Sequence, residues 1–237
     1  MVNLKEEGVP EPVERDVPVL CVKSLLGYLF SDQYGVSISK DSLLKYWNHV
    51  TEFMEWGSEH PGKFTHIPLA IYGDEARYTN STGFVEKVVC LLLNMPLWSP
   101  RSTRTSRYLL FAIRESCMDS YRTTLWPVYA HLARQLNDLF STGVDIPGSS
   151  PTKTLKFCLT EIRGDWSWHC DALQLKPRWS SLSCCYKCPA SRKADQYQFT
   201  NYTESAAWIE EQFTHTHFIS HILKPGRICL LDPKQHV

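Results

Sequence analysis

The chain has 237 residues, and its 25 lysines and arginines are balanced by 25 aspartates and glutamates. This length fits one large domain or a domain with an appendage, and zero net charge argues against indiscriminate binding of nucleic acid through a basic surface. No run of ~18 apolar residues is present, so no membrane-spanning helix is expected. The charged, proline-containing N-terminus lacks the apolar core of a secretion signal, so we expect an intracellular protein.

The N-terminal quarter of the chain changes character near residue 19. Residues 1–18 are rich in Glu and Pro and predict a flexible leader, because they offer too little apolar surface to offset the cost of ordering. Residues 19–60 have helical periodicity and predict a small helical prelude that docks on the core. Within it, Ser39 is placed to begin a second helix that continues through Trp47. The alternative for this part is plain packing helices.

Residues 63–183 predict the core, an α/β domain with a mixed sheet. Three β-rich stretches are followed by a helix with an i, i+3, i+4 apolar stripe and then by a fourth β-rich stretch. The expected strands cover residues 65–72, 87–95, 108–113 and 155–162, and the expected helix covers residues 125–140. Residues 184–237 predict a C-terminal insertion that contains a zinc knuckle.

Two aspartates follow the first and fourth expected strands, and each comes directly after a glycine. They are Asp74 and Asp165. If these strands are neighbours, ~4.8 Å apart, the carboxylates converge and repel unless a divalent cation neutralises them. Mg²⁺ held by such acids activates an attacking oxygen in phosphoryl transfer. The alternative is turn chemistry, in which each aspartate binds its own backbone. Glu75 and Glu161 are weaker candidates.

The C-terminal part contains residues with metal-ligand spacing. Cys185 and Cys188 form a CxxC pair, and His217 and His221 have the i, i+4 spacing of one helix face. Together they predict a structural Zn²⁺ site, although the gap between the pairs is wider than the ~12–15 residues of an ordinary finger. The alternative is two buried thiols in a reducing compartment. Other candidate ligands are Cys184, His169, Cys170 and His215.

A basic loop and a group of tryptophans suggest contact with nucleic acid. Arg101, Arg104 and Arg107 recur every three residues beside hydroxyl side chains, a pattern that can contact successive phosphates. A solvated surface loop has the same pattern. The tryptophans could stack on exposed bases, but core packing is the alternative for them: Trp166, Trp168 and Trp179.

Three segments together resemble a known family. YGDEARYT after a strand, NMPLWSPRSTRTSRYLLFAIRES, and TEIRGDWSWHCDALQLKPRW followed by CCYKC resemble transposase-derived proteins found in many copies in dinoflagellate genomes. More distantly they resemble the core of CACTA and Plavaka-type cut-and-paste DNA transposases. The resemblance covers roughly residues 65–188, and its most specific part is the second Gly-Asp followed by CxxC.

The resemblance implies a ribonuclease-H-like fold with an Asp-Asp-Glu triad that holds two Mg²⁺ ions. Asp74 matches the first acid and Asp165 the second, while the knuckle and the following H-x-x-x-H match the zinc ligands. The third acid of the family lies farther downstream, on a helix beyond the insertion, and Glu210 and Glu211 lie inside the insertion and are not assigned to it. The chain therefore resembles an N-terminal portion, or a degenerate copy, of such a transposase.

The expected function is therefore that of a DNA transposase core, with Mg²⁺-dependent cleavage and strand transfer in the intact family and no, or very low, activity in this chain alone. The alternative is a non-catalytic zinc-bearing module that binds DNA or protein. The resemblance implies DNA as the partner, self-association into a homo-oligomer, and a nuclear location. No H-E-x-x-H, G-x-S-x-G or phosphate-loop motif points to another enzyme class.

Overall fold

The computed structural model describes residues 1–217 except positions 80–82, 84, 101, 103–104, 150, 152, 174 and 176–179. The chain is divided into two compact units: one contains Met1–Gly164, and the other lies within Asp165–Cys229. The first unit has a mixed α/β fold built on a four-stranded sheet, and the second unit contains short helices joined by turns.

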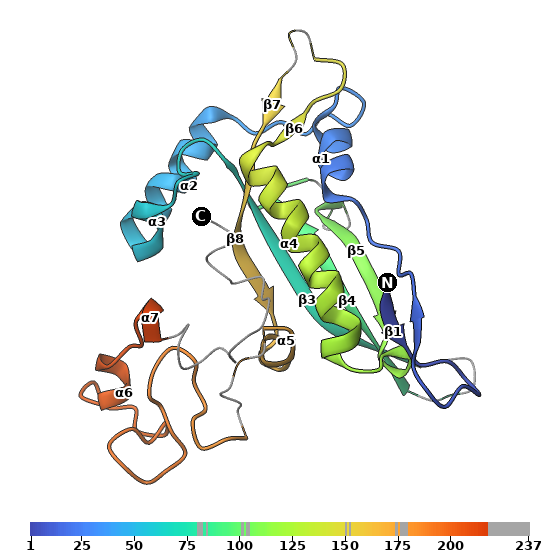
Figure 1. The fold of residues 1–237 in the computed structure, drawn as a ribbon. Coiled ribbons are helices and arrows are strands. Elements are labelled where there is room, and N and C mark those ends of the chain that lie inside the picture. Colours follow the sequence, from blue (N-terminus) through green and yellow to red (C-terminus); the bar gives the residue numbers. More distant parts are fainter. Residues whose placement is uncertain are drawn as a thin grey trace. The chain divides into compact units, whose positions relative to one another are not determined.

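The central sheet has the order β5-β4-β3-β8 (Figure 1). The three antiparallel strands are β3 (Ile67–Thr79), β4 (Val85–Asn94) and β5 (Arg107–Arg114). The fourth strand, β8 (Phe157–Gly164), pairs with β3 in parallel. The predicted sequence of three strands, a helix and a fourth strand is therefore confirmed, and the first and fourth predicted strands are neighbours.

Strand β3 is longer than the sequence predicts. The expected strand ends before Gly73, but pairing with β4 continues from Ala70 to Thr79 and places Asp74 opposite Cys90. Asp74 therefore lies inside a strand, so the expectation that it follows the strand is wrong, as is the alternative that it forms a turn. The physical reason is that β4 supplies backbone partners for the whole segment, which outweighs the turn preference of Gly-Asp.

Helix α4 (Trp126–Ser141) lies along one face of the sheet (Figure 1). Its side chains at i, i+3 and i+4 spacing form the apolar stripe that the sequence predicts, and the Phe111 and Tyr129 rings, 6.0 Å apart, join the helix to β5. The buried residues of the helix are Val128, Tyr129, Leu132, Ala133, Leu136 and Leu139. This helix face and the facing side chains of β3 and β4 form the main core, and we call this side of the sheet the α4 face.

The predicted helical prelude consists of α1 (Val22–Phe30), α2 (Lys40–Phe53) and α3 (Glu55–Glu59). Ser39 caps α2 by accepting a hydrogen bond from the Ser42 amide, as expected from the sequence. The Trp47 indole is fully buried and donates to the His66 carbonyl at 3.0 Å. This bond attaches α2 to the segment that enters β3.

Residues 1–18, which we expected to form a flexible leader, instead contain a small antiparallel sheet of β1 (Val2–Leu4) and β2 (Val13–Arg15). Thr124 donates to the Asn3 carbonyl at 2.6 Å, so β1 is bound to the turn that precedes α4. The other elements are η2 (Glu115–Cys117), η3 (Tyr121–Leu125), β6 (Val144–Asp145), β7 (Thr154–Leu155), α5 (Trp166–Ala172), α6 (Ala207–Glu210) and α7 (His215–His217).

His66 makes the stability of the first unit depend on pH. Its ring is buried, with Nε2 2.9 Å from the Phe140 carbonyl oxygen, and burial lowers the pKa of the imidazole. The unfolded chain, with an ordinary histidine pKa of ~6.5, therefore binds the proton more readily than the folded chain. We expect the free energy of unfolding to fall as pH drops below ~6.5, by at most about 1.4 kcal/mol per pH unit from this group.

Urea unfolding at several pH values between 7.5 and 5 measures this effect. The control is His66→Gln, whose amide can still donate to Phe140 but does not titrate. The same pH slope in the variant and the wild type would show that another group is responsible.

Candidate functional site

Asp74 is half-buried on β3, and its carboxylate is fixed by neighbours on its own strand. One oxygen accepts a hydrogen bond from the Tyr72 hydroxyl at 3.1 Å, and the other accepts from the Glu75 amide at 2.8 Å. Tyr72 and Asp74 lie on the same side of β3, because residues two apart in a strand share a face. A carboxylate has about four lone-pair positions, so these two bonds leave room for a cation.

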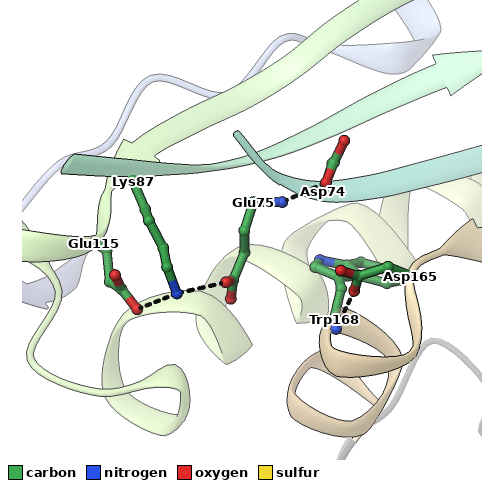
Figure 2. Close-up of polar contacts among 6 residues, drawn as sticks. All are labelled: Asp74, Glu75, Lys87, Glu115, Asp165 and Trp168. Carbon is green, nitrogen blue, oxygen red and sulfur yellow. Dashed lines mark hydrogen bonds and ion pairs between the residues drawn. The ribbon is translucent and has the colours of Figure 1, made fainter. Parts of the chain in front are cut away.

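Glu75 points to the opposite side of β3 from Asp74 (Figure 2). It lies on the α4 face, where its side chain is only 15% exposed and forms an ion pair with Lys87 at 3.1 Å. Lys87 also contacts Glu115 at 3.6 Å, and its hydrogen bond to Glu75 raises the pKa of the lysine. Glu75, a weaker candidate in the sequence, is therefore part of an ion-pair network and lies on the other face of the sheet from Asp74.

Arg107 lies beside Tyr72 on the face that contains Asp74. Its guanidinium carbon is 5.5 Å from the centre of the Tyr72 ring, within the range of a cation–π contact. Burial raises the pKa of Tyr72, and the hydrogen bond to Asp74 raises it further, so the hydroxyl keeps its proton and remains a donor to that carboxylate. Arg107 is exposed, which leaves its donors available to an anion. Arg101 and Arg104 lie outside the described residues.

Asp165 directly precedes α5 and caps it. Its side chain accepts a hydrogen bond from the Trp168 amide at 2.6 Å (Figure 2), and its backbone is still extended. The sequence analysis gave as an alternative that each aspartate binds nearby backbone, and this is observed for Asp165. The cap uses one carboxylate oxygen, and the residue is exposed, so capping does not exclude a metal ligand at the second oxygen.

The two Gly-Asp steps are related by strand register. In the parallel pair of β3 and β8, Gly73 is the partner of Gly164. Each of these glycines is followed directly by an aspartate. Because parallel strands run in the same direction, the backbone continues in the same direction after Gly73 and after Gly164.

In the second unit, Cys185 and Cys188 lie in a tight turn. The Lys187 amide donates to the Cys185 sulfur at 3.3 Å. Burial, together with the adjacent Cys185 and Cys184 thiols, raises the pKa of the Cys188 thiol to about 11. Crowded thiols of this kind are poor thiolates by themselves, but a bound cation would stabilise their charged form. Two cysteines at this spacing would supply half of the four ligands of a tetrahedral Zn²⁺ site.

A backbone hydrogen bond joins this turn to the segment that contains the predicted histidines. The Phe213 amide donates to the Lys187 carbonyl at 2.7 Å, and the Phe213 ring stacks on His217 with centres 4.1 Å apart. His217 therefore lies in the segment that is bonded to the CxxC turn. His221 lies outside the described residues. In the part of the chain that is described, no group of three or more His, Cys, Asp or Glu side chains is arranged to hold a metal ion.

Comparisons with protein-family models, with curated proteins and with solved structures found no match for this chain. The helices of the described residues include no candidate for a bilayer-spanning segment. The function is therefore argued from the geometry of the residues themselves.

Sequence reasoning missed two residues beside the candidate sites. Tyr72 binds Asp74 from two positions earlier in the strand, and strand periodicity applied to residues 72–74 could have identified it. Tyr186, inside the CxxC turn, stacks on Trp166 at 5.0 Å. Because these two residues are far apart in sequence, no local pattern predicts their contact.

Proposed function

We propose that the first unit is a ribonuclease-H-like core of the transposase type, and that Asp74 and Asp165, the residue directly after this unit, share a divalent cation for phosphodiester chemistry on DNA. The observation that supports this most directly is the parallel register of Gly73 with Gly164 in a sheet of order β5-β4-β3-β8. A mixed sheet in which three strands, a helix and a fourth strand follow one another also supports this proposal.

The register matters because an aspartate comes directly after each of the paired glycines. Adjacent strands are ~4.8 Å apart, and on this spacing we base the proposal that the two aspartates bind one cation together. Carboxylate oxygens are the ligands that Mg²⁺ prefers. A Mg²⁺ ion bound there would activate the attacking oxygen and stabilise the leaving oxygen at a phosphodiester.

Arg107 and Tyr72 supply the rest of the proposed site. Arg107 is exposed beside Tyr72, where its guanidinium can bind a DNA phosphate through two parallel hydrogen bonds. DNA is accordingly the proposed partner, the nucleus the proposed location, and a homo-oligomer the proposed state. No third acid is assigned, since Glu75 is on the other face and pairs with Lys87, so we propose that cleavage by residues 1–237 alone is absent or very low.

Cation binding tests the proposal. We expect Asp74→Asn and Asp165→Ser each to weaken Mn²⁺ binding about tenfold or more, measured by isothermal titration calorimetry, because each removes one of two charged ligands. Serine at position 165 can still cap α5, so the loss reports the carboxylate rather than the helix. The matched control is Glu75→Gln, one residue along on the opposite face, which should change Mn²⁺ affinity less than twofold.

Equal losses of Mn²⁺ affinity in Glu75→Gln and Asp74→Asn would contradict the assignment of the site. A nicking assay on supercoiled DNA with Mg²⁺ accompanies the titration. Robust nicking that disappears in Asp165→Ala would contradict the proposal of low activity, while supporting the two aspartates as the catalytic pair.

The second candidate function is a non-catalytic zinc-bearing module that binds DNA or protein. The hydrogen bonds of Lys187 to Cys185 and of Phe213 to Lys187 favour it, because they organise the turn without reference to the aspartates. Three results together would favour this module over the transposase core. The affinity for DNA should fall with rising salt, it should be unchanged in Asp74→Asn, and the protein should bind no Mn²⁺.

A further inference from the structure

The CxxC turn of the second unit contacts the helix that begins after Asp165. Tyr186, between the two cysteines, stacks on Trp166, the first residue of α5, with ring centres 5.0 Å apart and planes inclined by 24°. Lys187 lies 5.9 Å from the centre of the Tyr186 ring. One side of this ring stack is therefore adjacent in sequence to the proposed second metal-binding aspartate, and the other is inside the proposed zinc knuckle.

Helix α5 needs support from outside itself. It has 7 residues, far fewer than the ~12–15 at which an isolated helix becomes even marginally stable in water. Its buried side chains include Trp168, and its N-terminal cap is the bond from the Trp168 amide to Asp165. The orientation of the Asp165 carboxylate therefore depends on whether the first turn of α5 is formed.

The CxxC turn would likewise be stabilised from outside, by a metal ion bound to its cysteines. Cys185 directly precedes Tyr186, and Cys188 follows it after Lys187. The Lys187 amide donates a hydrogen bond to the Cys185 sulfur. A metal that joins both sulfurs would fix the backbone between them. The position of the Tyr186 ring would then be fixed as well, because it projects from that backbone.

We infer that zinc binding at the CxxC turn positions Asp165, and that Trp166 and Tyr186 are the positioning residues that couple the two. This inference rests on the proposed function, because it assigns the knuckle a role at the proposed Mg²⁺ site. In this role the zinc site would hold Asp165 in position and would not act as an independent module. The coupling acts through one stacked pair of rings and the helix cap next to it.

Amide hydrogen exchange of the full chain, measured by NMR with and without one equivalent of Zn²⁺, tests this inference. Two amides report separately: Lys187 reports zinc binding through its bond to Cys185, and Trp168 reports the Asp165 cap. We expect Zn²⁺ to slow exchange at both amides in the wild type, by roughly three- to tenfold at Trp168, the range that a stacked ring pair supports.

Variants of Tyr186 separate coupling from zinc binding. In Tyr186→Ala, Zn²⁺ should still slow exchange at Lys187 but should no longer slow it at Trp168. Tyr186→Phe keeps the ring and should restore the effect at Trp168. The matched control is Tyr202→Ala, the same substitution at an exposed position in the same unit, which should behave as the wild type.

Two outcomes would overturn the inference, and they differ. If Zn²⁺ slows exchange at Lys187 but never at Trp168, or equally at Trp168 in Tyr186→Ala, the coupling is wrong while the zinc site remains. If Zn²⁺ slows exchange at neither amide, the zinc site itself is wrong and the coupling falls with it. Neither outcome depends on DNA cleavage, so the Mg²⁺ proposal is judged separately by the Mn²⁺ titration.

Discussion

Removal of the proposed zinc ion from the reduced protein is expected to unfold the turns that follow α5, between Cys184 and His217, and to leave the sheet of Met1–Gly164 folded. Structural zinc contributes about 10–16 kcal/mol of apparent binding free energy in small finger peptides, more than the total stability of most domains. The second unit has three short helices among its described residues. Packing of these helices would not supply a free energy comparable to that of zinc binding.

The measurement is metal content together with limited proteolysis, before and after chelation under reducing conditions. We expect about one zinc per chain, and rapid cleavage after residue 184 once the metal is removed. Cys185→Ser and Cys188→Ser should reproduce the effect of chelation, because serine does not replace a thiolate ligand. Cys21→Ser is the control, since Cys21 is exposed and lies in the first unit.

Purified protein that contains no zinc under reducing conditions would contradict the metal site. Retention of full zinc content in the Cys185→Ser, Cys188→Ser double variant would assign the metal to other ligands. Protection of the second unit that is unchanged by chelation would show that its turns are stable without metal.

Replacement of Gly143 by alanine is expected to destabilise the first unit by about 3 kcal/mol. Gly143 follows α4 with φ of +82°, and its amide binds the Asp138 carbonyl at 3.1 Å to close the helix end. Alanine in this conformation costs roughly 1–2 kcal/mol. In addition, a Cβ at this position would meet the Leu155 carbonyl oxygen at 2.5 Å, and relieving such an overlap costs typically 1–3 kcal/mol.

Gly148→Ala is the matched control for this prediction. Gly148 has the same φ of +82°, but its Cβ would meet no atom closer than 3.6 Å. The expected loss there is about 1 kcal/mol, from backbone conformation alone. Urea denaturation of the two variants compares their free energies of unfolding. Equal losses in the two variants would show that the backbone of Leu155 moves aside and that the contact beside Gly143 is not rigid.

The Gly143 contact also bears on the proposed site. Leu155 is in β7, separated by one residue from β8 and its terminal Gly164, so the end of α4 is held against the segment that leads to Asp165. A shift of this segment would change the register of β8 with β3. We therefore expect Gly143→Ala to weaken Mn²⁺ binding as well if that register brings the aspartates together.

Much of the first unit could be predicted because its signals are local. The apolar stripe of α4 and the β-rich stretches of β3, β4, β5 and β8 each depend on side chains a few residues apart. The cap of α2 at Ser39 is equally local. The hairpin of residues 1–18 was missed for the converse reason. Its composition predicts disorder, but contacts such as Thr124 with Asn3 stabilise it from more than a hundred residues away.

For the candidate site, the sequence by itself determined which residues have the required chemistry: Asp74 and Asp165 after glycines, and Cys185 with Cys188 in a turn. Only the tertiary structure decided where they lie. Register with β4 placed Asp74 within a strand and turned Glu75 to the other face, and parallel pairing aligned Gly73 with Gly164. The reason is physical: residue type fixes donors and charge locally, but strand register is set by backbone partners distant in sequence, and a shift of one residue exchanges the two faces.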